Sequence, residues 1–154
     1  MPAIRSISRV TGGEGLRTVK CVLVDTGPLV ALLDRQDQDH RWAVGEGRRL
    51  PPKMFSCEAV LSEVHFLTRD IPEAKGRIEG WLTEGWLELP FSVREHHSAV
   101  HELMLRYVNV PMSFADACLV RMSELWPEAM VFTLDSDFRV YRRNKRQHLP
   151  LICP

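Results

Sequence analysis

Short apolar runs separated by polar segments recur along most of this chain of 154 residues. Runs that are rich in β-branched residues or that alternate between apolar and polar residues predict strands. The predicted strands are residues 20–25, 53–56, 86–90, 130–135 and 149–153. The runs at 20–25 and 130–135 are nearly continuous in apolar residues, which is typical of strands that are buried on both faces.

Segments with apolar residues at helical spacing lie between these predicted strands. In residues 57–69, for example, a helical stripe is formed by Val60, Leu61, Val64, Phe66 and Leu67. Helices are also predicted at residues 26–34, 39–49, 72–83, 93–107 and 113–125, with a last short helix carrying Phe138 and Tyr141. The alternation of strands and helices predicts the α/β class, as a three-layer α/β/α sandwich around a mainly parallel sheet.

The first part of the chain lacks any such pattern. Residues 1–18 are mostly polar and contain Gly12, Gly13 and Gly15, so ordering them is costly in backbone entropy. We therefore expect a flexible extension at residues 1–19 that is dispensable for folding, followed by one domain at residues 20–154.

Composition excludes several classes of protein. Apolar residues make up 45% and charged residues 26%, as in ordinary globular proteins, and no apolar run is long enough to span a membrane. With no secretory signal either, the expected location is the cytoplasm. The four cysteines are widely separated, which argues against a disulfide framework or a zinc ribbon. Glycine-rich phosphate loops and a serine-hydrolase elbow are absent from the sequence.

Four acidic residues stand out by their positions. Asp25 and Asp135 each end an apolar strand, whereas Glu63 and Asp116 lie on helices among residues that face the core. Carboxyl ends of parallel strands meet at one edge of a sheet, where ligands bind. Carboxylates gathered beside a core repel one another and lose hydration, and a divalent cation is the usual compensation. Hard oxygen ligands favour Mg²⁺ or Mn²⁺.

Each acid also has a purely structural interpretation. Asp25 and Asp135 are suited to begin the helices that follow them, and Ser113-x-x-Asp116 fits a capping box. Glu63 could instead point to solvent. These interpretations are compatible with metal binding, because a capping aspartate can offer its second oxygen to a cation.

The chain resembles a PIN domain, and most of all the toxin subunit of VapBC-type toxin–antitoxin pairs. The resemblance covers residue 20 to the end and is carried by four segments, each containing one of the acids. They are VLVDTGPLVALLD at 22–34, LSEVHFLTR at 61–69, MSFADACLVRMSE at 112–124 and VFTLDSDFRVYRR at 131–143. Such toxins usually begin only a few residues before the first strand, so the extension departs from the family pattern.

The resemblance implies a metal site of Mg²⁺ or Mn²⁺ and a role for each matching residue. The catalytic metal ligands would be Asp25, Glu63, Asp116 and Asp135. These four would bind the metal directly or through water, and Asp137 would be an auxiliary ligand or would support one of the four through a hydrogen bond. The hydroxyls of Thr26 and Thr133 would orient carboxylates or a phosphate, although both residues also suit ordinary turns.

The implied activity is metal-dependent endoribonuclease cleavage of RNA phosphodiester bonds by a homodimeric toxin that pairs with an antitoxin protein. A run of cations without an anion is a possible RNA-binding surface, and it fits an ordinary solvated face near the C-terminus equally well: Arg139, Arg142, Arg143, Lys145 and Arg146. The alternatives are an inactive PIN-like module that binds RNA or protein, and an RNA-processing nuclease without an antitoxin. A zinc site at His97 and His101 lacks a third ligand nearby in the sequence.

Overall fold

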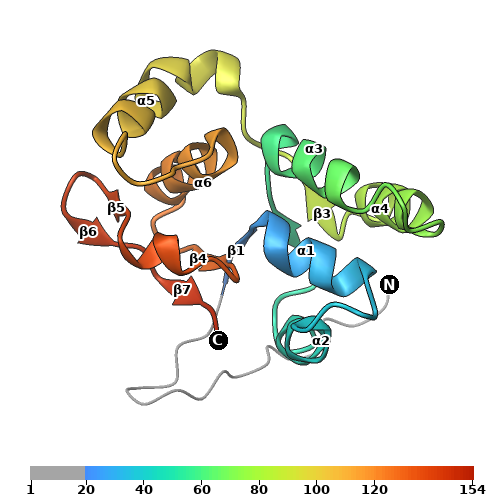
Figure 1. The fold of residues 1–154 in the computed structure, drawn as a ribbon. Coiled ribbons are helices and arrows are strands. Elements are labelled where there is room, and N and C mark those ends of the chain that lie inside the picture. Colours follow the sequence, from blue (N-terminus) through green and yellow to red (C-terminus); the bar gives the residue numbers. More distant parts are fainter. Residues whose placement is uncertain (1–19) are drawn as a thin grey trace.

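The computed structural model describes residues 20–154, so the extension predicted at residues 1–19 lies outside the described part of the chain. Five strands form a sheet in the order β3-β2-β1-β4-β7, and every neighbouring pair is parallel (Figure 1). The strands are β1 Val22–Val24, β2 Met54–Phe55, β3 Leu87–Glu88, β4 Met130–Phe132 and β7 Leu151–Ile152. This sheet confirms the predicted α/β class with a mainly parallel sheet.

Two groups of helices flank the sheet (Figure 1). The helices are α1 Thr26–Leu33, α2 His40–Gly47, α3 Glu58–Leu67, α4 Ala74–Thr83, α5 Val93–Arg106 and α6 Phe114–Leu125. α1 packs against α2 and α3, whereas α5 packs against α6, and α6 also contacts β1 and β4. All three residues of β1 have no exposed surface, because helices cover both faces of the central strand. Within residues 20–154, no helix is long and apolar enough to cross a membrane.

The segment after β4 differs from the prediction. The short helix that was predicted to carry Phe138 and Tyr141 is a 3-10 helix at Ser136–Arg139 that ends before Tyr141. An antiparallel hairpin of β5 Arg142–Arg143 and β6 Gln147–His148 follows, and the sequence did not predict it. Its turn places Asn144 and Lys145 at φ values of 48° and 68°. A turn of this kind usually contains glycine, so the sequence carried little signal for it.

The strand order reverses beside β1, the place where open α/β sheets have a crevice at the carboxyl edge of the sheet. From β1 the chain moves to β2 and β3 on one side, and it later returns to β4 on the other side of β1. Ligands of open α/β sheets bind outside the carboxyl ends of the strands at such a reversal. The backbone N–H of Asp25 donates to Phe132 O at 2.9 Å, so the ends of β1 and β4 lie directly side by side.

Candidate active site

Asp25 follows β1 and forms the centre of the site. It is the N-cap of α1, and its Oδ1 accepts a hydrogen bond of 2.7 Å from the backbone N–H of Thr26. Its Oδ2 accepts a second bond of 2.7 Å from the Thr133 hydroxyl. Asp25 is only 5% exposed. The carboxylate is therefore both a helix cap and a buried, firmly oriented acid.

Thr133 links this carboxylate to Asp135 in the loop after β4, which ends at Phe132 rather than at Asp135 as predicted. The Oγ1 atom of fully buried Thr133 donates to Asp25 and accepts the backbone N–H of Asp135 at 2.9 Å. Asp135 then caps the 3-10 helix, because its Oδ1 accepts the backbone N–H of Asp137 at 2.8 Å. The loop after β4 is thus folded around one threonine hydroxyl, which fixes Asp135 relative to Asp25.

A close contact holds this loop against the start of α1. A Cβ atom added to Gly27 would lie 3.1 Å from the Cβ of Leu134. Carbon atoms usually pack at about 3.5–4.0 Å, so a larger residue at Gly27 would require the loop between Thr133 and Asp135 to shift away from α1.

Glu63 enters the site from α3. The Thr26 hydroxyl donates to Glu63 Oε2 at 2.7 Å, and the Glu63 side chain is half-buried. α1 and α3 pack together, which brings the two residues into contact across 37 positions of sequence. Glu63 therefore does not merely point to solvent, and Thr26 orients it much as Thr133 orients Asp25.

Asp116 enters from the first turn of α6. Its Oδ2 accepts the backbone N–H of Ser113 at 2.9 Å, and the Ser113 hydroxyl accepts the backbone N–H of Asp116 at 3.0 Å. This is the capping box that the sequence suggested. The same Oδ2 accepts a hydrogen bond of 3.2 Å from the hydroxyl of buried Tyr141. Asp116 is only 7% exposed. It therefore caps α6 while it lies buried at the site, and not on the solvent-facing side of the helix.

The electrostatics show that these acids influence one another. The pKa of Asp25 is raised from 3.8 to about 7, mainly because burial removes water from its carboxylate. The hydrogen bonds from Thr133 and Thr26 oppose this rise in the pKa, and the negative charges of Asp116 and Asp135 add to it. The pKa of Asp116 is also raised, first by burial and then by the charge of Asp135. Three of the acids thus repel one another across one crevice, and Glu63 is connected to them through Thr26.

No model of a known protein family matches the sequence, and no curated protein matches it significantly. Among solved structures, the chain is similar to the crystal structure of Mycobacterium tuberculosis VapC20, a toxin that cleaves the sarcin-ricin loop. The two sequences are 21% identical, and the similarity covers 77% of this chain and 93% of that chain with a TM-score of 0.70. The chain has a VapC-type PIN fold. In this PIN fold the four acids come from the ends of β1 and β4 and from α3 and α6.

The donor set at this edge of the PIN fold suits a hard divalent cation. Its side chains are carboxylates, and two of them have raised pKa values that a nearby cation would lower again. Among residues 20–154, no three His, Cys, Asp or Glu side chains are already close enough to hold a metal ion. A bound cation would therefore reach some of these carboxylates through water or draw them inward.

Asp137, the predicted auxiliary ligand, and the two α5 histidines that were weighed against a zinc site lie outside the set of four acids. Asp137 is half-buried, and its negative charge contributes to the raised pKa of Tyr141, so it lies beside the site. His97 and His101 are exposed on α5, and the described part of the chain shows no metal-binding cluster around them.

The predicted basic surface divides into two parts. Three of its guanidinium groups bind the protein's own backbone: Arg139 donates to Pro154 O, Arg142 to Arg139 O and Val140 O, and Arg143 to Ser123 O and Pro127 O. Lys145 and Arg146 are instead exposed at the turn of the β5–β6 hairpin. The first three cations therefore hold the C-terminal segment in place, and the hairpin turn carries the accessible positive charge.

Tyr141 is the site residue that sequence reasoning missed. The prediction used it only as an apolar position of a short helix. Its ring is fully buried against Tyr107 and Phe138, and its hydroxyl reaches Asp116. Burial and the charge of Asp116 raise its pKa, so it remains a hydrogen-bond donor at neutral pH. Nothing in the local sequence separates such a tyrosine from an ordinary core aromatic.

Proposed function

We propose that this protein is a metal-dependent endoribonuclease that hydrolyses RNA phosphodiester bonds, and that it is the toxin of a toxin–antitoxin pair. The observation that carries the proposal is the set of hydrogen bonds that orients the acids at the crevice. Thr133 holds Asp25 and Asp135, while Thr26 holds Glu63. The similarity in fold to a toxin that cleaves RNA supports the same chemistry.

The proposed cofactor is Mg²⁺ or Mn²⁺, held by Asp25, Glu63, Asp116 and Asp135 with support from Asp137. When bound, such a cation activates water and neutralises charge that develops on the phosphate. The contribution of the chain is to orient these carboxylates in advance. Each aspartate has an oxygen fixed by a backbone N–H, so it does not have to be ordered when substrate arrives.

The test is cleavage of RNA by the purified protein with Mn²⁺, with Mg²⁺ and with EDTA. We expect EDTA to abolish cleavage, and Asp116→Asn to lower it by at least about 100-fold, because an amide is a poor ligand for these cations. The Asn side chain can still accept the backbone N–H of Ser113, so the fold should survive the change. Asp70→Asn, at an exposed residue outside the site, is the matched control. Cleavage that persists in EDTA and in Asp116→Asn would refute the mechanism.

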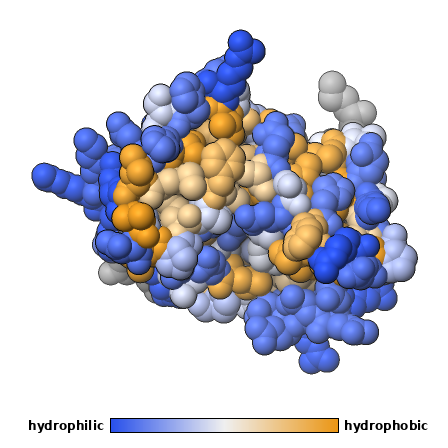
Figure 2. All heavy atoms as spheres, turned by 45° about the horizontal axis from the view of Figure 1, so that its top comes forward, coloured by the Kyte–Doolittle hydropathy of each residue, from blue (hydrophilic) through white to orange (hydrophobic). Residues whose placement is uncertain are grey.

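We further propose that the protein is a homodimer and that an antitoxin segment covers the acidic groove. Hydrophobic side chains are exposed on the face shown in Figure 2. Phe66 and Leu67 are 65% and 54% exposed and line an open cavity of about 430 Å³ together with Ser62 and Glu63. A partner with apolar side chains and an arginine would bury this surface and pair with the carboxylates.

The homodimer and the antitoxin are tested separately. Light scattering at micromolar concentration should give the mass of two chains, and a small protein should co-purify from the native source. A monomer that purifies alone would contradict both parts of the proposal.

A further inference from the structure

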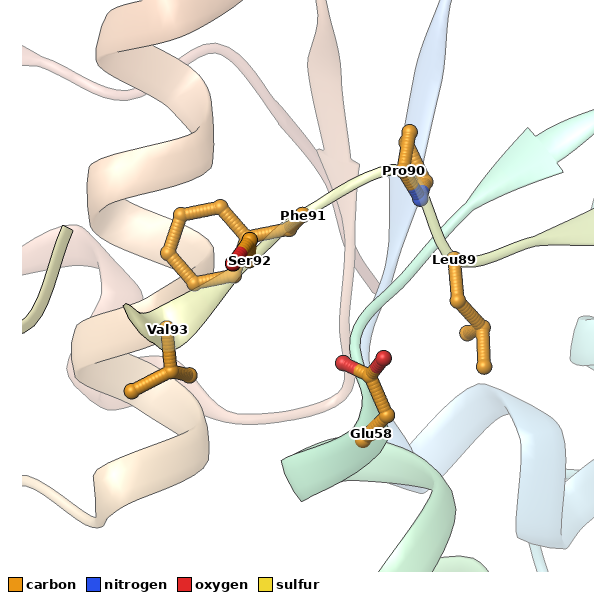
Figure 3. A pocket seen from close by; sticks show the side chains of 6 residues that line it. All are labelled: Glu58, Leu89, Pro90, Phe91, Ser92 and Val93. Carbon is orange, nitrogen blue, oxygen red and sulfur yellow. The ribbon is translucent and has the colours of Figure 1, made fainter. Parts of the chain in front are cut away.

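A second cavity lies at the same edge of the sheet, between the start of α3 and the loop that joins β3 to α5. Its volume is about 500 Å³, within the usual range for sites that bind small molecules. Figure 3 shows the residues that line it: Glu58, Leu89, Pro90, Phe91, Ser92 and Val93. The mechanism proposed above uses none of these residues.

The position of this cavity relative to the acids follows from the strand order. Glu58 begins α3 shortly after β2, and Leu89 directly follows β3. The Ser56 hydroxyl donates to Val24 O at 2.8 Å, and its backbone N–H donates to Glu88 O at 2.9 Å, so the ends of β1, β2 and β3 are joined at one edge. Glu58 and Glu63 share α3, about 7.5 Å apart along its axis and about 140° apart around it, so they face different sides of the helix. The cavity therefore lies beside the acids at the same edge of the sheet, and none of the four acids lines it.

The lining combines apolar walls with a single carboxylate. In Figure 3 the Glu58 carboxylate points into the space between Phe91 and Leu89. Phe91 is a fixed wall, because it is buried and stacked on His96 with ring centroids 5.3 Å apart. Glu58 is exposed to solvent, and within residues 20–154 its carboxylate makes no hydrogen bond or ion pair with another side chain. Its oxygens are thus available to accept hydrogen bonds from a ligand.

Apolar walls and a single carboxylate favour a base of the RNA over its sugar–phosphate backbone. A carboxylate repels phosphate, so the sugar–phosphate backbone is a poor occupant. A base is a good occupant, because apolar side chains pack against its faces and its amino group donates to a carboxylate. Cytosine, adenine and guanine carry an exocyclic amino group. Uracil has a carbonyl oxygen where cytosine has the amino group, and its remaining edge donor, N3–H, lies between two carbonyl oxygens that a carboxylate repels.

We propose that this cavity receives one base of the RNA beside the scissile bond, and that Glu58 selects a base with an amino group. The inference rests on the proposed ribonuclease function and adds a specificity-determining residue to it. The occupant is a base of single-stranded RNA, since a base must leave its stack to enter such a cavity.

The experiment compares cleavage of a randomised RNA pool by the wild-type protein, Glu58→Ala and Glu58→Gln. We expect the wild-type protein to disfavour uracil at one position near the cut. Glu58→Ala should reduce this discrimination by about 5- to 150-fold, the range for a good contact between a side chain and a base. Glu58→Gln should partly restore cleavage at uracil, because an amide donates to a carbonyl oxygen. Glu102→Gln, an exposed change further along α5, should leave the base preference unaltered.

Failure of this inference is distinguishable from failure of the ribonuclease proposal. A wild-type protein that cleaves RNA, with a base preference that Glu58→Ala leaves unchanged, overturns the role of Glu58 alone. Binding of short RNAs to Asp25→Asn, with and without Glu58→Ala, gives a measure that does not need cleavage. The inference is also overturned if Asp25→Asn binds short RNAs equally tightly whether uracil or cytosine stands at each position of the RNA. A protein that neither cleaves nor binds RNA overturns both.

Discussion

Replacing Asp25 with asparagine should stabilise the metal-free protein while it removes activity. The reason is the burial of the Asp25 carboxylate, which is 5% exposed and lies near the charges of Asp116 and Asp135. Asparagine has nearly the same shape without the charge, so it resembles the protonated acid that the folded chain prefers.

The size of the effect follows from the pKa. The difference between 3.8 and about 7 corresponds to roughly 4 kcal/mol at about 1.4 kcal/mol for each unit of pKa. Because the folded state binds the proton more tightly, ionisation of Asp25 lowers stability progressively as the pH rises from about 4 to about 7, and the loss is complete above that window. Asparagine keeps the bond from Thr26 but disrupts the one from Thr133, which costs about 1 kcal/mol. The net gain is then about 1 kcal/mol near pH 5 and about 3 kcal/mol near pH 8.

The assay is thermal unfolding of both proteins in EDTA at the two pH values. For a domain of this size, we expect Asp25→Asn to melt roughly 2–4 °C higher at about pH 5 and 6–12 °C higher at about pH 8. Asp70→Asn removes the same charge from an exposed position and should show no such growth with pH. Adding Mn²⁺ should raise the melting temperature of the wild-type protein. The difference in melting temperature between the wild-type protein and Asp25→Asn should then become smaller. The reasoning would be refuted if, in EDTA, Asp25→Asn did not melt higher than the wild-type protein, or if the difference did not depend on pH.

Two further substitutions test how the site is held together. Thr133→Val removes the hydroxyl that lowers the pKa of Asp25, so activity should fall by about 10- to 100-fold and its pH profile should move to higher pH. Thr68→Val is the control, because it removes a buried hydroxyl that donates to Val64 O on its own helix. An equal loss of activity in Thr68→Val would contradict a specific role for Thr133. Gly27→Ala should push the loop at Leu134 away and lower activity at constant RNA binding. Gly76→Ala, where an added Cβ meets nothing within 4 Å, should stabilise α4 by up to about 1 kcal/mol with activity unchanged. Normal turnover by Gly27→Ala would show that the close contact does not matter.

The sequence predicted the elements whose physical causes are local. The apolar runs that became β1 and β4 have a clear pattern, and Ser113 and Asp116 have the spacing of a capping box. The contacts between the acids depend instead on the strand order, which brings Thr133 to Asp25 across 108 positions and Thr26 to Glu63 across 37. Tyr141 shows the limit most clearly, because its role depends on a hydroxyl that meets Asp116 only after α6 and the C-terminal segment have packed.

The capping roles of Asp25, Asp116 and Asp135 have an evolutionary consequence. Asparagine is about as good an N-cap as aspartate at positions 25 and 135, and at position 116 an amide oxygen can still accept the backbone N–H of Ser113, so the backbone does not require the acids. Selection for folding therefore does not protect the proposed nuclease activity. A lineage harmed by that activity can lose it through one change to asparagine and keep an abundant, intact protein. Among related sequences, inactive copies should thus be common and well folded, and the residues at these three positions should identify them.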